Sequence, residues 1–127
     1  MNGTVREWID KAEGDYRTAR REFEAVDSPS YDATCFHAQQ FVEKLMKAIM
    51  IHNKVVPPRI HNLAQFSGLL EPLCPELDLA IEDLNHLTTL GMAVRYPGES
   101  ADCNDAEEVL QICDRLRDAL EPFIPRG

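Results

Sequence analysis

Apolar and polar residues recur along most of this chain with the period of an α-helix. Apolar side chains return every three or four positions through residues 5–25 and again through residues 30–52, a spacing that places them on one face of a helix. No segment alternates apolar and polar residues between hairpin turn signals, as a half-buried strand does. The pattern predicts an all-α protein, most simply an up-and-down antiparallel bundle of about five helices.

Turn and capping residues mark the expected ends of these helices. Thr4 and Glu7 have the spacing of a capping box at the start of the first helix. Ser30 is suited to cap the second helix, and the consecutive prolines Pro57 and Pro58 exclude helix after it. We expect a shorter third helix introduced by residues 60–63, a fourth helix over residues 77–92, and a fifth that is capped by Asp102 or Asn104 and ends near Pro122.

The second expected helix carries the most informative pattern. Its apolar face consists of Phe41, Val42, Leu45, Ala48 and Ile49. A polar stripe follows the opposite flank and consists of His37, Gln40, Lys44 and Lys47. Polar groups at this spacing form a continuous ridge that could hold a phosphate, a nucleotide or a carboxylate of a partner. A helix face that is merely solvated has the same spacing, and periodicity alone favours that interpretation.

Length and charge narrow the classes of partner. A chain of 127 residues is expected to form one domain over residues 1–127. Its 13 basic and 22 acidic residues give a formal charge of −9, which opposes general attraction to a nucleic-acid backbone. Nucleic-acid contact therefore requires a local basic patch. The residues that could form one, if the fold gathers them, are Arg17, Arg20, Arg21, Lys44, Lys47, Lys54, Arg59 and Arg95.

Cysteine spacing and hydropathy bear on metals and location. The four cysteines include no Cys-x-x-Cys pair, which argues against a zinc site or a dithiol redox site. The acidic residues between 99 and 108 are explained by a helix start, where negative charge is favourable, so no metal and no cofactor is expected. No secretory signal and no apolar run of about 20 residues is found, so we expect a cytoplasmic protein without a membrane span.

Three segments together carry a resemblance to a known family. They are HAQQFVEK at 37–44 followed by Lys47-Ala48, IHNL at 60–63, and RYPG at 95–98, with Trp8 and Asp15-Tyr16 of the first helix fitting the same pattern. In this order they resemble the HEPN domain family over nearly the whole chain. The resemblance implies a dimeric bundle of about five helices, with the polar stripe and the Arg95-Tyr96 loop near a shared cleft. It also implies binding of nucleotides or RNA there, and a minimal nucleotidyltransferase as the partner protein.

Many HEPN proteins are toxins of toxin and antitoxin pairs that cleave RNA without a metal. They use an arginine and a histidine separated by four to six residues, and this motif is absent here, because no histidine stands five to seven positions after any arginine. No catalytic residue is therefore assigned. Arg95, His37 and His61 remain weak candidates, since catalytic partners need only be close in space.

The residues expected to bind a ligand are His37, Gln40, Lys44, Lys47, His61, Arg95 and Tyr96. Arg95 offers a planar fork that matches a phosphate, or it ties its loop to a carboxylate such as Glu43 or Asp102. Tyr96 could stack on a base or accept a nucleotide on its hydroxyl, as the resemblance implies for certain relatives, or it could be a buried ring. Glu43 is interpreted as an ion-pair partner of Arg95 or Lys47.

Three hypotheses follow. The first is a dimeric binding module that acts with a minimal nucleotidyltransferase in a toxin-antitoxin-like pair. The second is a metal-independent ribonuclease toxin with a rearranged site, in which Arg95 acts with His37 or His61. The third is a structural dimer whose polar ridge is only solvated.

Overall fold

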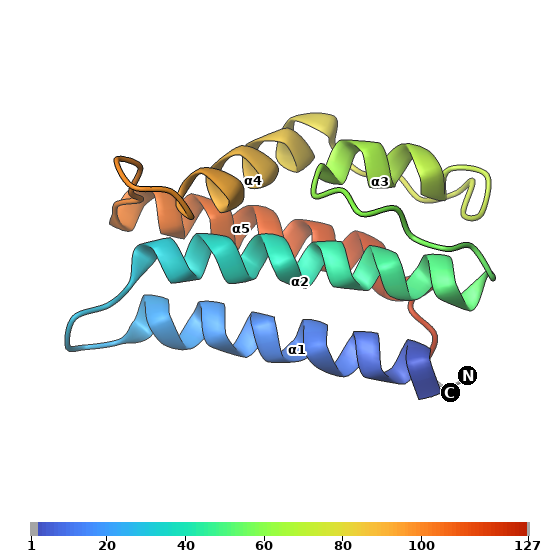
Figure 1. Ribbon diagram of the computed structural model, residues 1–127, viewed down its shortest axis with the longest axis horizontal. Coiled ribbons are helices and arrows are strands. Elements are labelled where there is room, and N and C mark those ends of the chain that lie inside the picture. Colours follow the sequence, from blue (N-terminus) through green and yellow to red (C-terminus); the bar gives the residue numbers. More distant parts are fainter. Residues whose placement is uncertain (1–2, 127) are drawn as a thin grey trace.

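The computed structural model describes residues 3–126 and consists of helices joined by loops (Figure 1). The helices are α1 (Gly3–Glu24), α2 (Tyr31–His52), α3 (Leu63–Leu70), α4 (Ile81–Ala93) and α5 (Cys103–Leu120), followed by one 3-10 turn, η1 (Glu121–Phe123). The described residues contain no strand. The expected all-α bundle of about five helices is confirmed.

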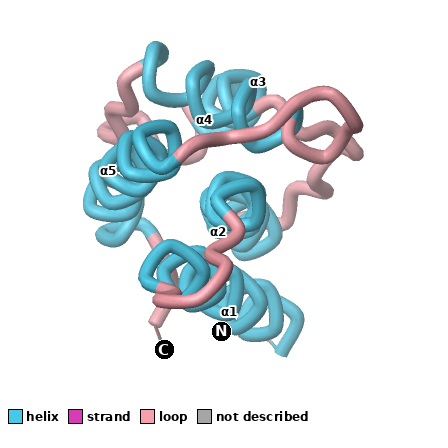
Figure 2. The backbone as a smooth tube through the Cα atoms, turned by 90° about the vertical axis from the view of Figure 1, so that its left-hand side faces the viewer, coloured by secondary structure: helices cyan, strands magenta, loops and turns pink. Residues whose placement is uncertain are grey.

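Helix α2 is the centre of the bundle. It packs against α1, α3, α4 and α5, and the view along the bundle shows these helices around it on three sides, with loops on the fourth (Figure 2). All five residues of its expected apolar face are at most 1% exposed. Burial of a large apolar side chain contributes about 1.5–3 kcal/mol, so this face anchors the core. The opposite flank of α2 is left to carry polar groups.

Side-chain caps fix the starts of three helices. Ser30 accepts from the amide of Ala33 at the start of α2, and Asn62 accepts from the amide of Gln65 at the start of α3. Asp102 forms a reciprocal capping box with Asp105 at the start of α5, and each such cap contributes about 1 kcal/mol. Two acidic residues of this region are thus used at the helix start, as expected.

Two expected helix starts are wrong. Thr4 does not cap α1, because the helix already includes Gly3, so the capping box with Glu7 does not form there. The fourth helix begins at Ile81 rather than at residue 77. Pro75 and the turn that bonds the amide of Leu77 to the carbonyl of Cys74 precede it, and the backbone is not helical again until residue 81.

Helices α2 and α4 approach each other closely at Gly91, which is buried. A Cβ atom at position 91 would lie 2.4 Å from the Cβ of Gln39 and 3.2 Å from the carbonyl oxygen of Cys35. Only glycine fits this crossing without displacing a helix. The crossing also holds Gln39 in place beside the polar flank of α2.

The cysteines differ in their expected reactivity. Burial raises the pKa of Cys35 and of Cys113 to about 12, whereas Cys103 is exposed. We expect iodoacetamide at pH 8 to alkylate Cys103 first, and Cys35 and Cys113 only after unfolding, because the thiolate is the nucleophile. Mass spectrometry of native and urea-unfolded protein checks this order. Rapid native alkylation of Cys113 would contradict it.

The raised pKa values of Cys35 and Cys113 also determine whether the stability of the fold rises or falls with pH. Above about pH 8.5 the unfolded chain loses thiol protons that the native state keeps. Native protein then binds more protons than unfolded protein, so the free energy of unfolding contributed by these groups falls as pH rises.

Candidate functional site

Two acidic side chains lie under the polar flank of α2, and each holds one histidine and one lysine. The first is Asp15 of α1, which is 8% exposed. Its Oδ1 lies 2.7 Å from Nδ1 of His37, and its Oδ2 accepts from Nζ of Lys44 at 2.5 Å. Because a buried carboxylate is costly unless it is paired, Asp15 fixes both stripe residues against α1.

The second acidic side chain is Glu43 of α2, which is 2% exposed. Its Oε1 lies 2.9 Å from Nδ1 of His61, and its Oε2 accepts from Nζ of Lys47 at 2.9 Å. Gln39 donates to the same Oε1 and to the backbone carbonyl of His61. Glu43 is therefore an ion-pair partner of Lys47, as expected, but its other partner is His61 and not Arg95.

The stripe is thus partly buried and built into a network. Gln40 donates to the side-chain oxygen of Gln39 at 2.8 Å, and Nζ of Lys47 lies 5.2 Å from the centre of the Trp8 ring. The side chains of Lys44 and Lys47 are 23% and 15% exposed. The interpretation as a freely solvated helix face is wrong for these residues, since they are held in fixed positions.

In both imidazoles one ring nitrogen is paired with a carboxylate, and the other has no partner among the described residues. Nδ1 of His37 and Nδ1 of His61 face carboxylates, and a carboxylate at one nitrogen favours the proton there and fixes the ring. Among the described residues, Nε2 of neither ring has a hydrogen-bond partner. The side chains are 30% and 51% exposed, so both Nε2 atoms are available to a ligand. In this state each Nε2 can accept a proton or, once protonated, donate one.

Arg95 and Tyr96 follow α4 in an exposed turn, and Tyr96 is 60% exposed. Arg95 forms no ion pair with any described residue; its guanidinium lies 5.9 Å from the Phe36 ring and 5.9 Å from the Tyr96 ring. The alternatives in which Arg95 is tied to Glu43 or Asp102, and in which Tyr96 is a buried ring, are therefore wrong. The proline and glycine that follow keep this turn outside the core.

Arg95 and His37 line one hollow although they come from different parts of the chain. The hollow measures about 220 Å³ and is also lined by Phe36 and Asp32. The Phe36 ring joins His37 and Arg95. It lies edge-on to the His37 ring, with 5.2 Å between the ring centres, and the Arg95 guanidinium lies over it. Asp32 places a carboxylate here, and its Oδ1 accepts from the amide of Ala101 at 2.7 Å. An anion in this hollow would meet a free guanidinium and an imidazole.

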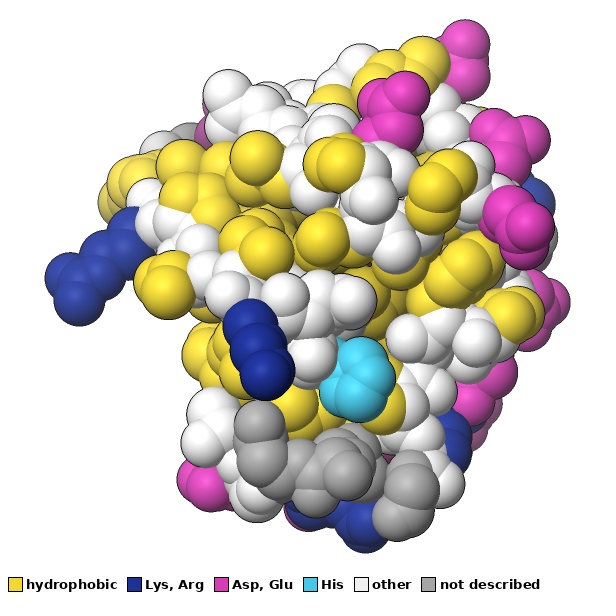
Figure 3. All heavy atoms as spheres, turned by 90° about the vertical axis from the view of Figure 1, so that its right-hand side faces the viewer, with side chains coloured by type: hydrophobic (Ala, Val, Ile, Leu, Met, Phe, Trp, Pro, Cys, Tyr) yellow, Lys and Arg dark blue, Asp and Glu magenta, His cyan; other side chains and the backbone are white. Residues whose placement is uncertain are grey.

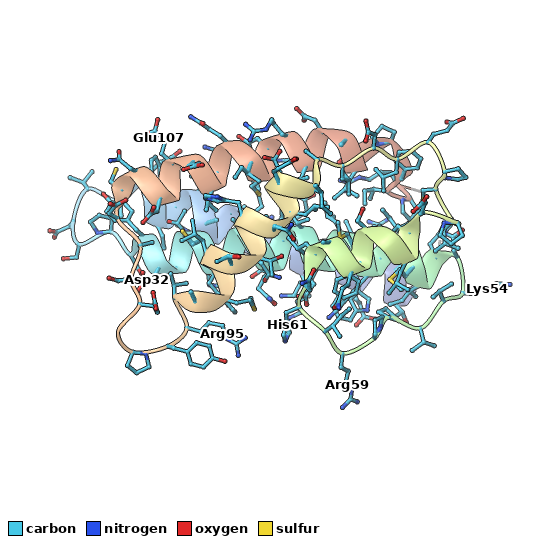
Figure 4. The ribbon with its side chains drawn as sticks, turned by 90° about the horizontal axis from the view of Figure 1, so that it is seen from above. Asp32, Lys54, Arg59, His61, Arg95 and Glu107 are labelled. Carbon is cyan, nitrogen blue, oxygen red and sulfur yellow. The ribbon has the colours of Figure 1, made fainter. Side chains whose placement is uncertain are left out.

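The expected basic residues are only partly gathered. Figure 4 shows Arg59, His61 and Arg95 projecting along one long edge of the molecule, with Lys54 at one end of it. Arg20 serves a different purpose, because it pairs with Asp114 of α5 and donates to the hydroxyl of Tyr16. Burial alone would lower the pKa of Arg20, but its hydrogen bonds to Tyr16 and Asp114 together outweigh burial and raise that pKa.

Sequence reasoning missed several contributors to this surface, among them Asp15, Asp32, Phe36 and Gln39. Asp15 has a recognisable signal, since it stands between Ala12 and Ala19 at helical spacing and so lies on the buried face of α1. Phe36 has no comparable signal, because its role depends on how the turn after α4 folds back. Within residues 3–126 no group of three or more histidine, cysteine or acidic side chains is arranged to hold a metal ion.

Comparison with known proteins adds a family and a fold. Residues 5–122 match the sequence profile of the HEPN domain. The crystal structure of TT1696 from Thermus thermophilus is similar, with a TM-score of 0.76 over 96% of this chain and 99% of that chain, at 20% sequence identity. This similarity concerns the fold alone. No curated protein sequence matches the chain. No helix among the described residues is long and apolar enough to cross a bilayer.

Proposed function

Because this chain belongs to the HEPN domain family, we propose that it is a binding module for the phosphate of a nucleotide or a nucleic acid. The proposed site is the flank of α2 with His37, Gln40, Lys44 and Lys47, together with His61, Arg95 and Tyr96. The module comprises residues 1–127 as one domain. It acts in the cytoplasm as a homodimer beside a minimal nucleotidyltransferase, in a toxin-antitoxin-like pair.

The observation that carries this proposal is the hollow shared by Arg95 and His37. Arg95 has no ion pair with a described residue, and an unpaired guanidinium is well suited to bind a phosphate through two parallel hydrogen bonds. His37 is held beside it by Asp15 at 2.7 Å. An unpaired cation next to an oriented imidazole supports recognition of a phosphate at this place.

The overall charge supports a small or short ligand. With a formal charge of −9, the chain repels a long polyanion except where cations are concentrated. In the site network, the charges of Lys44 and Lys47 are already matched by Asp15 and Glu43. The net attraction therefore comes from Arg95, and this favours one or a few phosphates over a long duplex.

Exposed apolar surface supports a protein partner. Figure 3 shows hydrophobic side chains gathered on the end of the molecule that lies at the right in Figure 1. In the connector before α3 Val56 is 88% exposed, and in α3 Leu69 is 43% exposed. Clustered apolar surface often marks protein contacts. The choice of a second copy and a nucleotidyltransferase as partners comes from the family resemblance.

A metal-independent ribonuclease is the second candidate, and the two carboxylate-bound histidines favour it. In this reaction one neutral Nε2 removes the proton of a 2′-hydroxyl, and the oxygen attacks the adjacent phosphorus. A second, protonated imidazole gives its proton to the departing 5′-oxygen, which leaves a 2′,3′-cyclic phosphate. Arg95 would stabilise the charge that builds on the phosphoryl oxygens. His37 and His61 are the available acid and base.

The test of both candidates is titration of the protein with ATP, GTP and a short single-stranded RNA by calorimetry, with a gel to detect cleavage. We expect Arg95→Ala to weaken binding about ten- to hundredfold, because hydrogen bonds to a charged group contribute roughly 1.5–3 kcal/mol. Arg115→Ala is the control, since Arg115 pairs with Asp83 away from this hollow. Equal affinities of wild type and Arg95→Ala would contradict the proposed site.

Asp32→Asn tests the sign of the electrostatics in the same titration. The amide oxygen can still accept from the Ala101 amide, while the negative charge in the hollow is removed. Phosphate binding should become tighter in this variant.

RNA cleavage that is abolished by Arg95→Ala would establish the ribonuclease in place of the binding module.

A further inference from the structure

A second hollow lies at the other end of the polar flank, between α1 and α2. It measures about 410 Å³ and is lined by Thr4, Glu7, Trp8, Lys11 and Lys44. Trp8 is partly buried and packs against the core. The hollow therefore combines a partly buried aromatic ring with the side chains of two lysines and one glutamate.

The side chains of this hollow have complementary chemistry. Lys11 forms no ion pair with any described residue, whereas Lys44 is bound to Asp15. The aliphatic stems of lysines extend apolar surface while their ammonium groups reach solvent. Lys47 lies over the Trp8 ring at 5.2 Å, a contact that restrains the indole. A flat aromatic group with an attached anion matches such a surface.

The two hollows are linked through one buried carboxylate. Asp15 binds both His37, which lines the Arg95 hollow, and Lys44, which lines the Trp8 hollow. Residues 37 and 44 are two turns apart on α2, or about 10 Å along its axis. A ligand that reaches from one hollow to the other therefore needs an aromatic group at one end and a phosphate at the other.

We infer that the Trp8 hollow is a stacking subsite for one unpaired nucleobase, whose own phosphate lies toward Lys11, while a phosphate further along the ligand reaches the Arg95 hollow. This inference rests on the proposed function and specifies its ligand: a nucleotide or a single strand, read by its base as well as its phosphate. Stacking on an aromatic side chain accepts every base, since each has a π-face. Duplex nucleic acid, whose bases are already stacked, is a poor ligand for this subsite.

The chain contains a single tryptophan, so the fluorescence of the wild-type protein reports on this subsite directly. Titrations use inorganic pyrophosphate, AMP and a single-stranded oligoadenylate, each followed in parallel by calorimetry. We expect quenching by AMP or the oligoadenylate and none by pyrophosphate. Quenching by AMP identifies a free nucleotide as sufficient, whereas quenching only by the oligoadenylate identifies a strand.

Variants at Trp8 give a second measurement. Trp8→Leu should weaken binding of the quenching ligand about five- to hundredfold, and Trp8→Phe should retain most of it, because phenylalanine keeps a stacking face. Circular dichroism verifies that both variants fold. Binding by calorimetry without quenching, and with equal affinity in Trp8→Leu, overturns the subsite but leaves the proposed function intact. Absence of calorimetric binding for every probe overturns both.

Discussion

Replacing Glu43 by alanine is expected to lower the free energy of unfolding by about 3 kcal/mol. Glu43 is 2% exposed and is bound by Lys47, His61 and Gln39. Its removal leaves the Lys47 ammonium, on a side chain that is 15% exposed, without its carboxylate. Removing one partner of a buried ion pair costs about 3–5 kcal/mol, and the partial exposure of Lys47 places this case at the lower end of that range. Urea unfolding followed by circular dichroism measures the change.

Glu107→Ala is the matched control. Glu107 also lies in a helix, but it is exposed, and Figure 4 shows it projecting from α5 on the side opposite Arg95 and His61. Substitution of such a surface residue changes stability by less than about 0.5 kcal/mol. If Glu43→Ala is as stable as Glu107→Ala, the network does not hold the site together and its fixed geometry must have another source.

Gly91→Ala is expected to destabilise the fold by about 2–3 kcal/mol. Alanine ordinarily favours a helix over glycine by about 1 kcal/mol, but the added methyl group would lie 2.4 Å from the Cβ of Gln39. The neighbouring atoms include the backbone oxygen of Cys35, so relief requires α4 to move away from α2. Overpacking of this kind costs about 1–3 kcal/mol. Thermal unfolding gives the difference.

Gly68→Ala separates the helix-favouring effect of alanine from the steric clash at the helix crossing. Gly68 is also in a helix, α3, and a Cβ atom there meets nothing within 4 Å. We expect this variant to be more stable than the wild type by up to about 1 kcal/mol. A stabilising Gly91→Ala variant would show that the α2 and α4 crossing is not as close as described. In Gly91→Ala, displacement of Gln39 should also weaken nucleotide binding, because Gln39 donates a hydrogen bond to the backbone carbonyl of His61.

The helices and the core were predictable because they depend on local periodicity and on caps. The apolar face of α2 is set by residues three and four apart, and Ser30 and Asp102 cap their helices in the ways that their side chains favour. The start of α4 was not predictable in this way. Residues 77–80 continue the apolar spacing, yet the turn after Pro75 prevents helix there.

In the candidate site, the pairing of Glu43 with Lys47 was predictable because both lie on α2 one turn apart, whereas pairings between different elements were not. The stripe on α2 identified His37 and Lys44, but their common partner Asp15 comes from a helix 22 or more positions earlier. Such a pairing depends on the rotation of α1 against α2, which spacing within one helix does not determine. The same holds for Arg95, whose freedom from ion pairs with described residues depends on the course of the turn after α4.

The two halves of the phosphate hollow differ in how they are supported. His37 stands on the central helix, whose backbone opens to solvent only when much of the bundle unfolds. Arg95 stands in an exposed turn, and its only described side-chain hydrogen bond is with the sulfur of Met92, three residues earlier. The histidine half is thus preorganised, whereas the arginine half gains most of its order from the ligand. The conformational entropy lost on binding therefore falls on the turn after α4, which makes that turn the place where affinity can be tuned without disturbing the fold.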